Sequence, residues 1–337
     1  MTSEANPNAT PAETAAVPGA ASPRSYGVGI VHYHAYPDLA ACLASVRAQG
    51  VVPEAIWVID ADGDPARRMP LEAAHPEVVF EATANLGYAA GANRILARAA
   101  RERPGMGFCL LMNPDVVLDD AFGESLMDAL IAHPAAALGT GKLLRSDGVT
   151  LDSAGITLPH HRRPRDRGSE QKDAGQYDRG EYVFGASGAA MMLRTEALAD
   201  LAIEGEIFDE DFFLYHEDTD LCWRSHVLGW RVYYEPRARA VHARGWQREG
   251  RFLVPAHVRR HSFKNHYLQI VKNESLAGFL LRLPLLLAWE ALRLGHALVR
   301  DRAILGGYAD AARLSGRALR KRRLLQPRRS RAARRKP

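Results

Sequence analysis

Apolar runs of strand length alternate with segments of helical spacing in the first third of the chain, and this alternation is what most constrains the fold. The strand-like runs are residues 28–31, 55–59, 78–80 and 108–112. Between them lie helix-like segments, including 39–46 and an Ala-rich stretch that ends near residue 100. Such alternation predicts a mostly parallel sheet covered by helices, in which ligands bind beyond the carboxyl ends of the strands. We therefore expect an α/β domain with its site at that edge.

Polar residues follow the ends of several of these strands. Asp60 closes the second run, and Asn113-Pro114-Asp115 follows the fourth. The stretch from Asn85 to Asn93 leads from the third strand into the Ala-rich helix. Because parallel strands end at one edge of the sheet, these side chains are candidates for ligand contact. Taken singly, each of them is also an ordinary turn or helix-start residue.

A second polar cluster lies between residues 208 and 220. Six acids surround the aromatic run Phe212-Phe213-Leu214-Tyr215, and they are Asp209, Glu210, Asp211, Glu217, Asp218 and Asp220. A carboxylate beside apolar walls has a raised proton affinity, which suits a general base. The alternative is that Asp218 or Asp220 only caps a short helix that ends at Gly229, because Asp is a favoured cap residue. A strand is expected at 231–234.

Taken together and in order, these motifs resemble family 2 glycosyltransferases of the GT-A fold, and most closely their bacterial rhamnosyltransferase-like group. The resemblance covers roughly residues 26–251. It implies a GT-A nucleotide-binding fold with a mostly parallel central sheet. It also implies an enzyme that moves a sugar, rhamnose in this group, from a nucleoside diphosphate to a saccharide or lipid-linked acceptor in cell-surface polysaccharide synthesis.

The resemblance assigns roles to individual residues. Asp218 matches the catalytic base, with Glu217 as a supporting acid. On the acceptor side the matching residues are Gly185, Ser187 and Gly188, to which we add Trp246. A close crossing of strands is the alternative reading of the small residues from 185 to 190. The matches on the donor side are Asp60, Asn85, Gly87, Asn93, Asn113 and Asp115.

A divalent metal, Mg²⁺ or Mn²⁺, is also implied. Asn113-Pro114-Asp115 stands where the family has an Asp-x-Asp motif, so Asp115 is the expected ligand and Asn113 departs from the pattern. His242 matches a histidine that completes the metal shell in related enzymes, and imidazole is an acceptable ligand for manganese. The metal would neutralise the departing diphosphate while Asp218 deprotonates the acceptor hydroxyl, in a single displacement with inversion.

Other functions are less consistent with the sequence. A nucleotidyltransferase acting on sugar phosphates would need a Gly-rich phosphate loop near the first strand, and residues 31–36 contain none. A dinucleotide-dependent oxidoreductase is disfavoured for the same reason. A non-enzymatic binder of anionic polymers could use the basic C-terminus but would leave the acids at 208–220 unexplained. The sequence also offers few aromatic residues there for stacking on nucleic acid, so no nucleic acid is expected as a partner.

The remaining segments define the expected domain organisation. Residues 1–24 are rich in Ala, Pro and Thr and lack the apolar core of a signal peptide, so a disordered tail is expected. A glycosyltransferase domain at 25–251 precedes a helical region at 252–320 and a basic disordered tail at 321–337. The polar stretch 159–181 suits a mobile loop over the site. Three dispersed cysteines indicate no disulfide framework or zinc site and fit a reducing compartment.

The C-terminal region is expected to contact the inner face of the cell membrane from the cytoplasm. Residues 276–299 are strongly apolar but interrupted by charges, and Glu290, Arg293, His296 and Arg300 fall within about 120° of a helical wheel. This predicts an interfacial helix, starting near Pro284, rather than a spanning one. Residues 300–337 hold fourteen Lys and Arg against two acids, which would attract anionic lipids. The alternative is that the leucines pack on the catalytic domain or on a second subunit.

Overall fold

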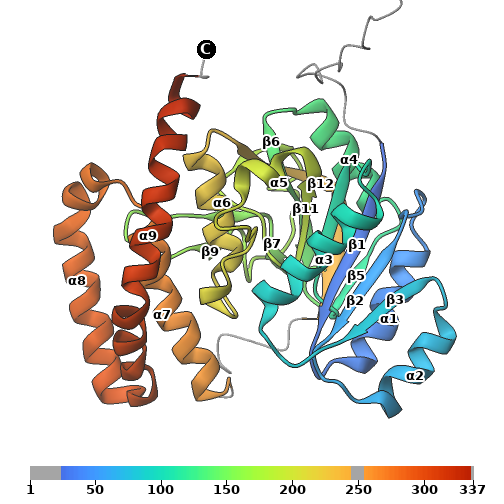
Figure 1. Cartoon of the computed structure of the whole chain (residues 1–337), viewed down its shortest axis with the longest axis horizontal. Helices are drawn as coiled ribbons and strands as arrows, with labels where there is room; N and C mark the ends of the chain where they lie inside the picture. The colour runs from blue at the N-terminus through green and yellow to red at the C-terminus, as the bar shows by residue number, and fades with distance from the viewer. Residues whose placement is uncertain (1–23, 244–253, 335–337) are drawn as a thin grey trace, which may run out of the picture.

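A ten-stranded mixed sheet runs through the computed structural model, which describes residues 24–243 and 254–334 (Figure 1). Across the sheet the strands lie in the order β10 (Glu181–Val183), β12 (Arg231–His242), β6 (Ala136–Leu144), β11 (Ala190–Arg194), β4 (Phe108–Met112), β1 (Tyr26–His32), β2 (Ile56–Asp60) and β3 (Val78–Ala82). Two short strands, β5 (Val116–Leu118) and β7 (Leu151–Ser153), pair with β12 and β6. Strands β1 to β4 are parallel, and β11 runs antiparallel between β4 and β6. The predicted α/β fold with a mostly parallel sheet is confirmed.

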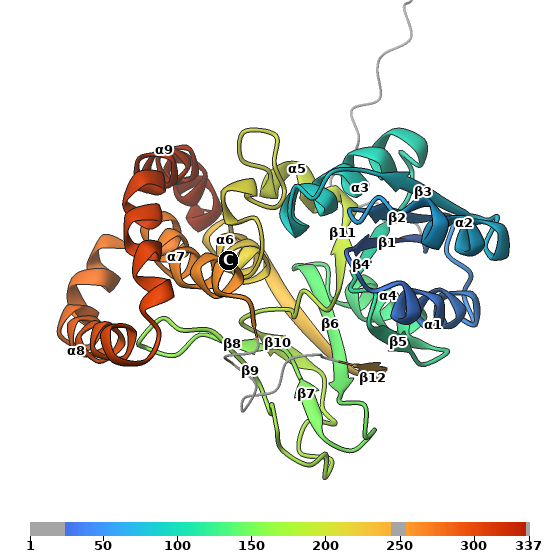
Figure 2. The same cartoon turned by 90° about the horizontal axis from the view of Figure 1, so that it is seen from below.

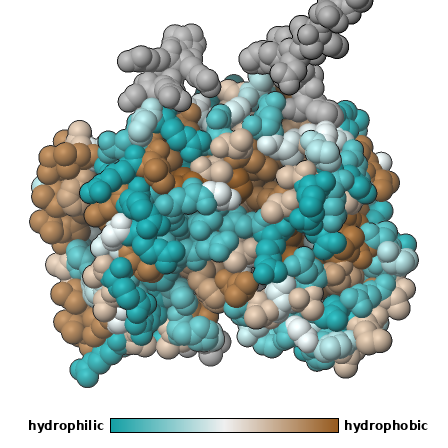
Figure 3. Space-filling view, viewed as in Figure 1, coloured by the Kyte–Doolittle hydropathy of each residue, from teal (hydrophilic) through white to brown (hydrophobic). Residues whose placement is uncertain are grey.

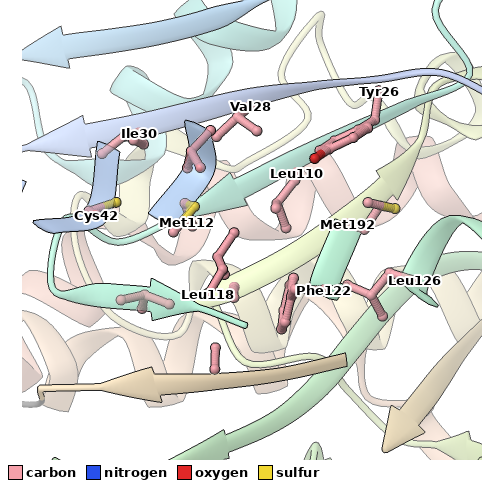
Figure 4. Packing of buried hydrophobic residues seen from close by; sticks show 14 of the residues in the cluster. Tyr26, Val28, Ile30, Cys42, Leu110, Met112, Leu118, Phe122, Leu126 and Met192 are labelled. Atoms are coloured by element: carbon pink, nitrogen blue, oxygen red, sulfur yellow. The ribbon is translucent and has the colours of Figure 1, made fainter. Parts of the chain in front are cut away.

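Helices cover both faces of the sheet and form two hydrophobic cores. The helices of the catalytic domain are α1 (Tyr36–Arg47), α2 (Pro65–Ala74), α3 (Tyr88–Glu102), α4 (Phe122–Ala132), α5 (Thr195–Leu201) and α6 (Glu217–Val227). On one face, α1 and α4 pack against alternate strand residues such as Val28, Ile30 and Leu110 (Figure 4). On the other, α3, α5 and α6 pack against Trp57, Ile59 and Leu111. The two-residue period of the strands thus divides their side chains between two cores.

The polar residues expected at strand ends lie at the carboxyl edge of the sheet. Asp60 is the last residue of β2 and pairs in register with His32, the last residue of β1. Strand β4 ends at Met112, immediately before Asn113. Strand β12 is longer than the predicted 231–234, and its end places His242 opposite Val116 of β5. This extension brings the second polar region to the same edge as Asp115.

The segment from 159 to 181 is structured rather than a simple loop. It contributes β9 (Arg165–Asp166), which pairs with β8 (Ile156–Thr157), and it leads into β10. The buried Lys142 Nζ lies 3.0 Å from Asp173 Oδ2 and also pairs with Asp178, which fixes the far end of the segment to β6. Its near end reaches toward the C-terminal helices (Figure 2), where the His161 ring contacts Trp289. Ion pairs of its polar residues therefore explain why a composition typical of loops is ordered here.

Three long helices, α7 (Ala256–Asn273), α8 (Leu276–Arg300) and α9 (Gly306–Arg334), stand together beside the catalytic domain, with a short 3₁₀ turn, η3 (Arg302–Leu305), before α9 (Figure 1). Helix α8 begins at Leu276, where Ser275 caps it, and runs through Pro284, so the predicted start near Pro284 is wrong. Helix α9 continues to Arg334, so the predicted disordered tail from 321 is wrong over most of its length. No helix in the described parts of the chain is both long and apolar enough to cross a bilayer.

The two sides of α8 differ sharply in polarity. Two of its polar residues face the other helices: Glu290 accepts hydrogen bonds from Tyr267 and Tyr308, and the Arg293 guanidinium lies 4.5 Å from the centre of the Phe263 ring. Fourteen residues with exposed side chains occupy the opposite half, all of them apolar, Pro or Gly: 276, 277, 280, 281, 284, 285, 287, 288, 291, 292, 294, 295, 298 and 299. They appear as a hydrophobic region at the left edge of Figure 3. Glu290 and Arg293 of the predicted polar arc thus lie on the packed side, whereas His296 and Arg300 of the same arc are exposed.

Candidate active site

The loop that precedes α6 has an unusual backbone conformation. Phe213, Tyr215 and His216 all have positive φ values, of 64°, 68° and 69°. Such values are uncommon for residues with side chains and tend to occur at functional sites, where surrounding contacts hold them. Here the fully buried Asn265 of α7 donates from its side-chain amide to the carbonyl groups of Phe212, Leu214 and Tyr215. A C-terminal helix therefore holds the loop that carries the catalytic acids.

Three of the clustered acids are used in ion pairs with the C-terminal helices. Asp209 lies between Lys272 of α7 and Lys321 of α9. Asp220 contacts the same Lys272, with 2.7 Å between Oδ2 and Nζ, and accepts from Asn273 at Oδ1. Asp211 pairs with Lys321 at 3.2 Å and with Arg317 at 2.9 Å. Of the other three acids, Glu210 is exposed and accepts a hydrogen bond from Asn93, and Glu217 and Asp218 at the start of α6 are the candidates for chemistry.

Replacing Lys321 with Met is expected to destabilise the protein strongly. The lysine is 1% exposed and contacts Asp209, Glu206 and Asp211, so its removal leaves the buried Asp209 with Lys272 and Asp211 with Arg317 as their remaining ion-pair partners among the described residues. Breaking a buried pair in this way costs about 3–5 kcal/mol. Chemical denaturation monitored by circular dichroism measures the loss.

The neighbouring Arg320 provides the matched control for this prediction. It pairs with Glu204 at an exposed position on the same turn of α9. Because exposed ion pairs contribute little, the Arg320→Met variant should unfold at nearly the wild-type denaturant concentration. Equal stability of the two variants would show that the Lys321 pairs do not hold α9 on the catalytic domain.

Glu217 and Asp218 occupy different environments at the start of α6. Asp218 Oδ2 accepts from the Gly188 amide at 3.0 Å, and its Oδ1 accepts from the Thr219 amide at 2.6 Å. Glu217 is buried, and its Oε2 has no hydrogen-bond partner in the described residues. Burial, followed by the negative charge of Asp218, raises the pKa of Glu217 well above its usual value. Burial therefore favours the neutral form of Glu217, and Asp218 is the candidate base.

Of the predicted acceptor residues that the structure describes, Gly188 lies beside this base. A Cβ at Gly188 would stand 3.2 Å from Asp218, so only glycine allows the loop this close. Gly185 packs against Ile156 of β8 and Cys222 of α6. This is consistent with the alternative that these small residues allow a close crossing of strands. Ser187 is buried, and its Oγ accepts from the Ala189 amide. Trp246 lies outside the described residues. Gly188 is thus the member of the set that directly contacts the candidate base.

Asp115 and His242 come together as expected for a metal-binding pair. His242 Nε2 lies 3.4 Å from Asp115 Oδ1, and its Nδ1 lies 2.8 Å from Oδ2 of the buried Asp152. Although burial lowers the proton affinity of this imidazole, the two carboxylates outweigh it and raise the pKa of His242 to about 9. Asp152 was missed in the sequence, where nothing marked the acid in the short strand β7 as a partner of His242.

These residues fit a divalent cation that completes its shell with substrate oxygens. A carboxylate on the second nitrogen of a ligating histidine is the usual outer-shell arrangement, because it fixes the ring and its tautomer. No group of three or more acidic, histidine or cysteine side chains in the described ranges forms a complete metal site. Mg²⁺ and similar ions commonly use one or two protein ligands together with phosphate oxygens and water. The donor set here is of that kind.

Of the predicted donor residues, Asn85 is exposed and Asp60 is buried. Asn85 is exposed at the edge of the sheet and accepts from the amide of Gly87, whose φ is 87° and whose Cα lies against Phe213. Asp60 is 1% exposed and receives hydrogen bonds from Tyr36 and from the amides of Asp62 and Gly63. It organises this end of the sheet, and a contact with the donor stays a prediction.

Asn93 and Asn113 are held by the protein in different ways. The Asn93 amide binds the backbone of residues 207 and 208 on one side and Glu210 on the other, so it positions the loop before η1 (Glu210–Phe212). The backbone amide of Asn113 donates to the Ala189 carbonyl, which ties the end of β4 to the acceptor loop. The backbone of Asn113 thus connects the donor and acceptor sides of the site. Contact of its side chain with the donor stays a prediction.

This fold, with polar residues at its carboxyl edge and an acid beside a glycine loop, is that of a GT-A type glycosyltransferase. Residues 28–201 match the family described as Glycosyl transferase family 2, so the chain belongs to that family. It is 26% identical over 234 residues to N-acetylglucosaminyl-diphospho-decaprenol L-rhamnosyltransferase of Mycobacterium tuberculosis, in strains CDC 1551 / Oshkosh and ATCC 25618 / H37Rv. These alignments cover 63% of this chain and 74% of the relatives.

A solved structure shares the fold at low sequence identity. The crystal structure of GalNAc-T7 with UDP, GalNAc and Mn²⁺ superposes with a TM-score of 0.53 and 11% identity. The match covers 74% of this chain and 48% of that one. It supports the GT-A type fold, and the rhamnosyltransferase-like assignment of the sequence is confirmed by the curated relatives.

Proposed function

We propose that this protein transfers a sugar to a lipid-linked saccharide acceptor in cell-wall or surface polysaccharide synthesis. The favoured donor is dTDP-rhamnose, from which rhamnose would be transferred. The observation that carries the reaction is the position of Asp218, which its hydrogen bond from Gly188 fixes beside the acceptor loop. The names of the curated relatives support the sugar and the lipid-linked acceptor.

The proposed chemistry is a single displacement with inversion. Asp218 takes the proton of the acceptor hydroxyl as its oxygen attacks the anomeric carbon, and Glu217, being neutral, does not compete for that proton. Asp115 and His242 would hold a divalent metal that neutralises charge on the departing diphosphate. Asn265 keeps the loop before α6 in its left-handed conformation, so that the base is positioned before substrate binds.

A panel of nucleoside-diphosphate sugars tests this function directly. Release of the nucleoside diphosphate is measured for each donor with and without polyprenyl-diphosphate-linked N-acetylglucosamine. We expect the largest acceptor-dependent release with dTDP-rhamnose. Acceptor-dependent release from another donor would correct the sugar, and no transfer from any member of the panel would overturn the proposal.

Removal of divalent metal is expected to abolish transfer. In excess chelator the activity should fall to background and return with added Mn²⁺ or Mg²⁺. Asp152→Asn should weaken metal affinity about 10–100-fold, the usual effect of losing an outer-shell partner. Calorimetric titration of the metal in the presence of nucleoside diphosphate measures this directly, and full turnover in chelator would refute the metal requirement.

We also propose that the enzyme lies on the inner face of the membrane, with the exposed half of α8 in the interface. Fourteen apolar, Pro and Gly positions form that half, which matches an interfacial helix more closely than a solvated surface. Such a location would bring the site to a lipid-linked acceptor.

A further inference from the structure

Two adjoining cavities lie between α7, α8 and the segment that joins β8 to β9. The first has a volume of about 280 Å³ and the second about 220 Å³. They share four lining residues, namely Arg163, His266, Trp289 and Arg293. Neither contains Asp115 or His242, so both are separate from the predicted metal-binding pair.

The first cavity has the character of an anion site. Its wall carries the guanidinium groups of Arg163, Arg259 and Arg293, and no carboxylate is among the described residues that line it. Arg259 is balanced by Asp301, with 2.9 Å between Nε and Oδ2. Arg293 stacks on Phe263 and Tyr267, and its buried Nη1 has no hydrogen-bond partner among the described residues. A buried donor of this kind costs free energy unless a ligand satisfies it.

Three histidines complete the wall of the first cavity: His216, His266 and His296. His266 is 8% exposed, and its Nδ1 finds no partner in the described structure. Burial and then the charges of Arg293 and Arg163 lower the pKa of His216 to about 3. These surroundings already disfavour any further positive charge, so the cavity is suited to bind negative charge instead.

The second cavity is lined mainly by apolar side chains beyond the residues shared with the first and Glu290, whose carboxylate accepts from Tyr267 and Tyr308, and it extends toward the exposed side of α8. Ile270 of α7 and Leu283 and Leu286 of α8 line it, together with Phe279 and Leu287. Phe279 is 37% and Leu287 60% exposed, so the cavity reaches the apolar half of α8. Its volume suits a short length of hydrocarbon chain rather than a whole lipid.

The first cavity also begins at the catalytic helix. His216 lines it and is the residue before Glu217 and Asp218 at the start of α6. An anion held there would lie near the end of the helix that carries the candidate base. The order along the molecule is therefore catalytic acids, cationic cavity, apolar cavity and exposed apolar face of α8.

From this order we propose that the two cavities form the acceptor subsite for a polyprenyl diphosphate, with the diphosphate in the cationic cavity and the first prenyl units in the apolar one. The inference rests on the proposed function, because it assumes a lipid-linked acceptor. Arg293 would contact the diphosphate directly, and Arg163 would close the cavity from the segment between β8 and β9.

Binding of farnesyl diphosphate to the full chain tests the subsite without any turnover. Calorimetry should show farnesyl diphosphate binding at least tenfold more tightly than either inorganic pyrophosphate or farnesol. Arg293→Gln and Arg163→Gln should each weaken it at least tenfold. Arg300→Gln, an exposed position on α8 that lines neither cavity, should leave it unchanged. Thermal unfolding of each variant shows whether it remains folded.

Several results would overturn the inference. Equal affinity for pyrophosphate would mean a simple phosphate site, and equal affinity for farnesol would mean an apolar site alone. Unchanged binding in both cavity variants would place the ligand elsewhere. A different result would contradict the proposed function alone: farnesyl diphosphate binds as expected, but no nucleoside-diphosphate sugar is turned over. If sugar is transferred to a lipid acceptor but farnesyl diphosphate does not bind, the proposed subsite is wrong and the proposed function stands.

Discussion

The Asp218→Asn variant should lose about 10²–10⁴-fold in the rate of sugar transfer while binding the donor almost as tightly as the wild type. The amide keeps an oxygen that can accept from the Gly188 backbone, and its NH₂ group cannot accept from the Thr219 amide, so the contact with the acceptor loop is the one expected to survive. What it lacks is the basicity needed to take the acceptor proton. Loss of kcat with donor affinity retained identifies an interaction made in the chemical step. Transfer kinetics and donor calorimetry together measure this.

The neighbouring Glu217→Gln variant is the control for this prediction. Burial and the negative charge of Asp218 raise the pKa of Glu217 and favour its neutral form, so replacing it with an amide of the same shape should cost far less activity. If instead Glu217→Gln is inactive and Asp218→Asn is not, the two roles are reversed. If Asp218→Asn loses donor binding but still transfers at high donor, Asp218 is not the base.

Local sequence patterns were sufficient for the parallel strands β1, β2 and β4, but not for the contacts made at the edge of the sheet. The runs at 28–31, 55–59 and 108–112 became β1, β2 and β4, because a buried parallel strand needs a continuous apolar run and little else. In the folded protein Asp115 lies beside His242, and Gly188 contacts Asp218, although the members of each pair lie far apart in sequence. The resemblance to a family supplied those pairings, since strand order cannot be read from the runs themselves.

The roles of the clustered acids could not be predicted from their local sequence. Asp209, Asp211 and Asp220 share the composition of their neighbours Glu217 and Asp218, but they pair with Lys272, Arg317 or Lys321 on helices that follow later in the chain. A carboxylate's role depends on which cation reaches it after folding. Asn265 was missed for the same reason, because nothing near it marks an amide that holds a loop from another element.

The C-terminal region differs from its prediction in how its charges are used. Arg317, Arg320 and Lys321 of α9 pair with acids of the catalytic domain, and Arg328 donates to backbone carbonyls of α5 and the following residue. Part of the positive charge expected to attract anionic lipid is thus used within the protein. The apolar half of α8 should therefore contribute more to membrane binding, and salt should detach the protein less, than the sequence suggested.

Flotation with liposomes should show the intact protein rising with vesicles that contain phosphatidylglycerol, and detaching in part at high salt. A variant with Gln at Leu280, Leu281 and Val299, which are 57%, 79% and 78% exposed, should float at least tenfold less. Fully burying one such side chain contributes about 1.5–3 kcal/mol, so a third of that from each of three residues already exceeds a tenfold change. None of the three lines either cavity.

The control for flotation must preserve the contacts between α9 and the catalytic domain. Ending the chain at Lys272 would remove Lys321 and expose the acids that it pairs with, so a truncated protein could fail to float because it misfolds. Gln at Val52, Met69 and Val149, which are 76%, 62% and 50% exposed on the catalytic domain, changes as much apolar surface and should leave flotation intact. The intact protein could instead stay at the bottom and be a dimer, while the α8 variant is a monomer. That result would show that the apolar half of α8 joins two subunits. Only selective loss of flotation in the α8 variant assigns that face to the membrane.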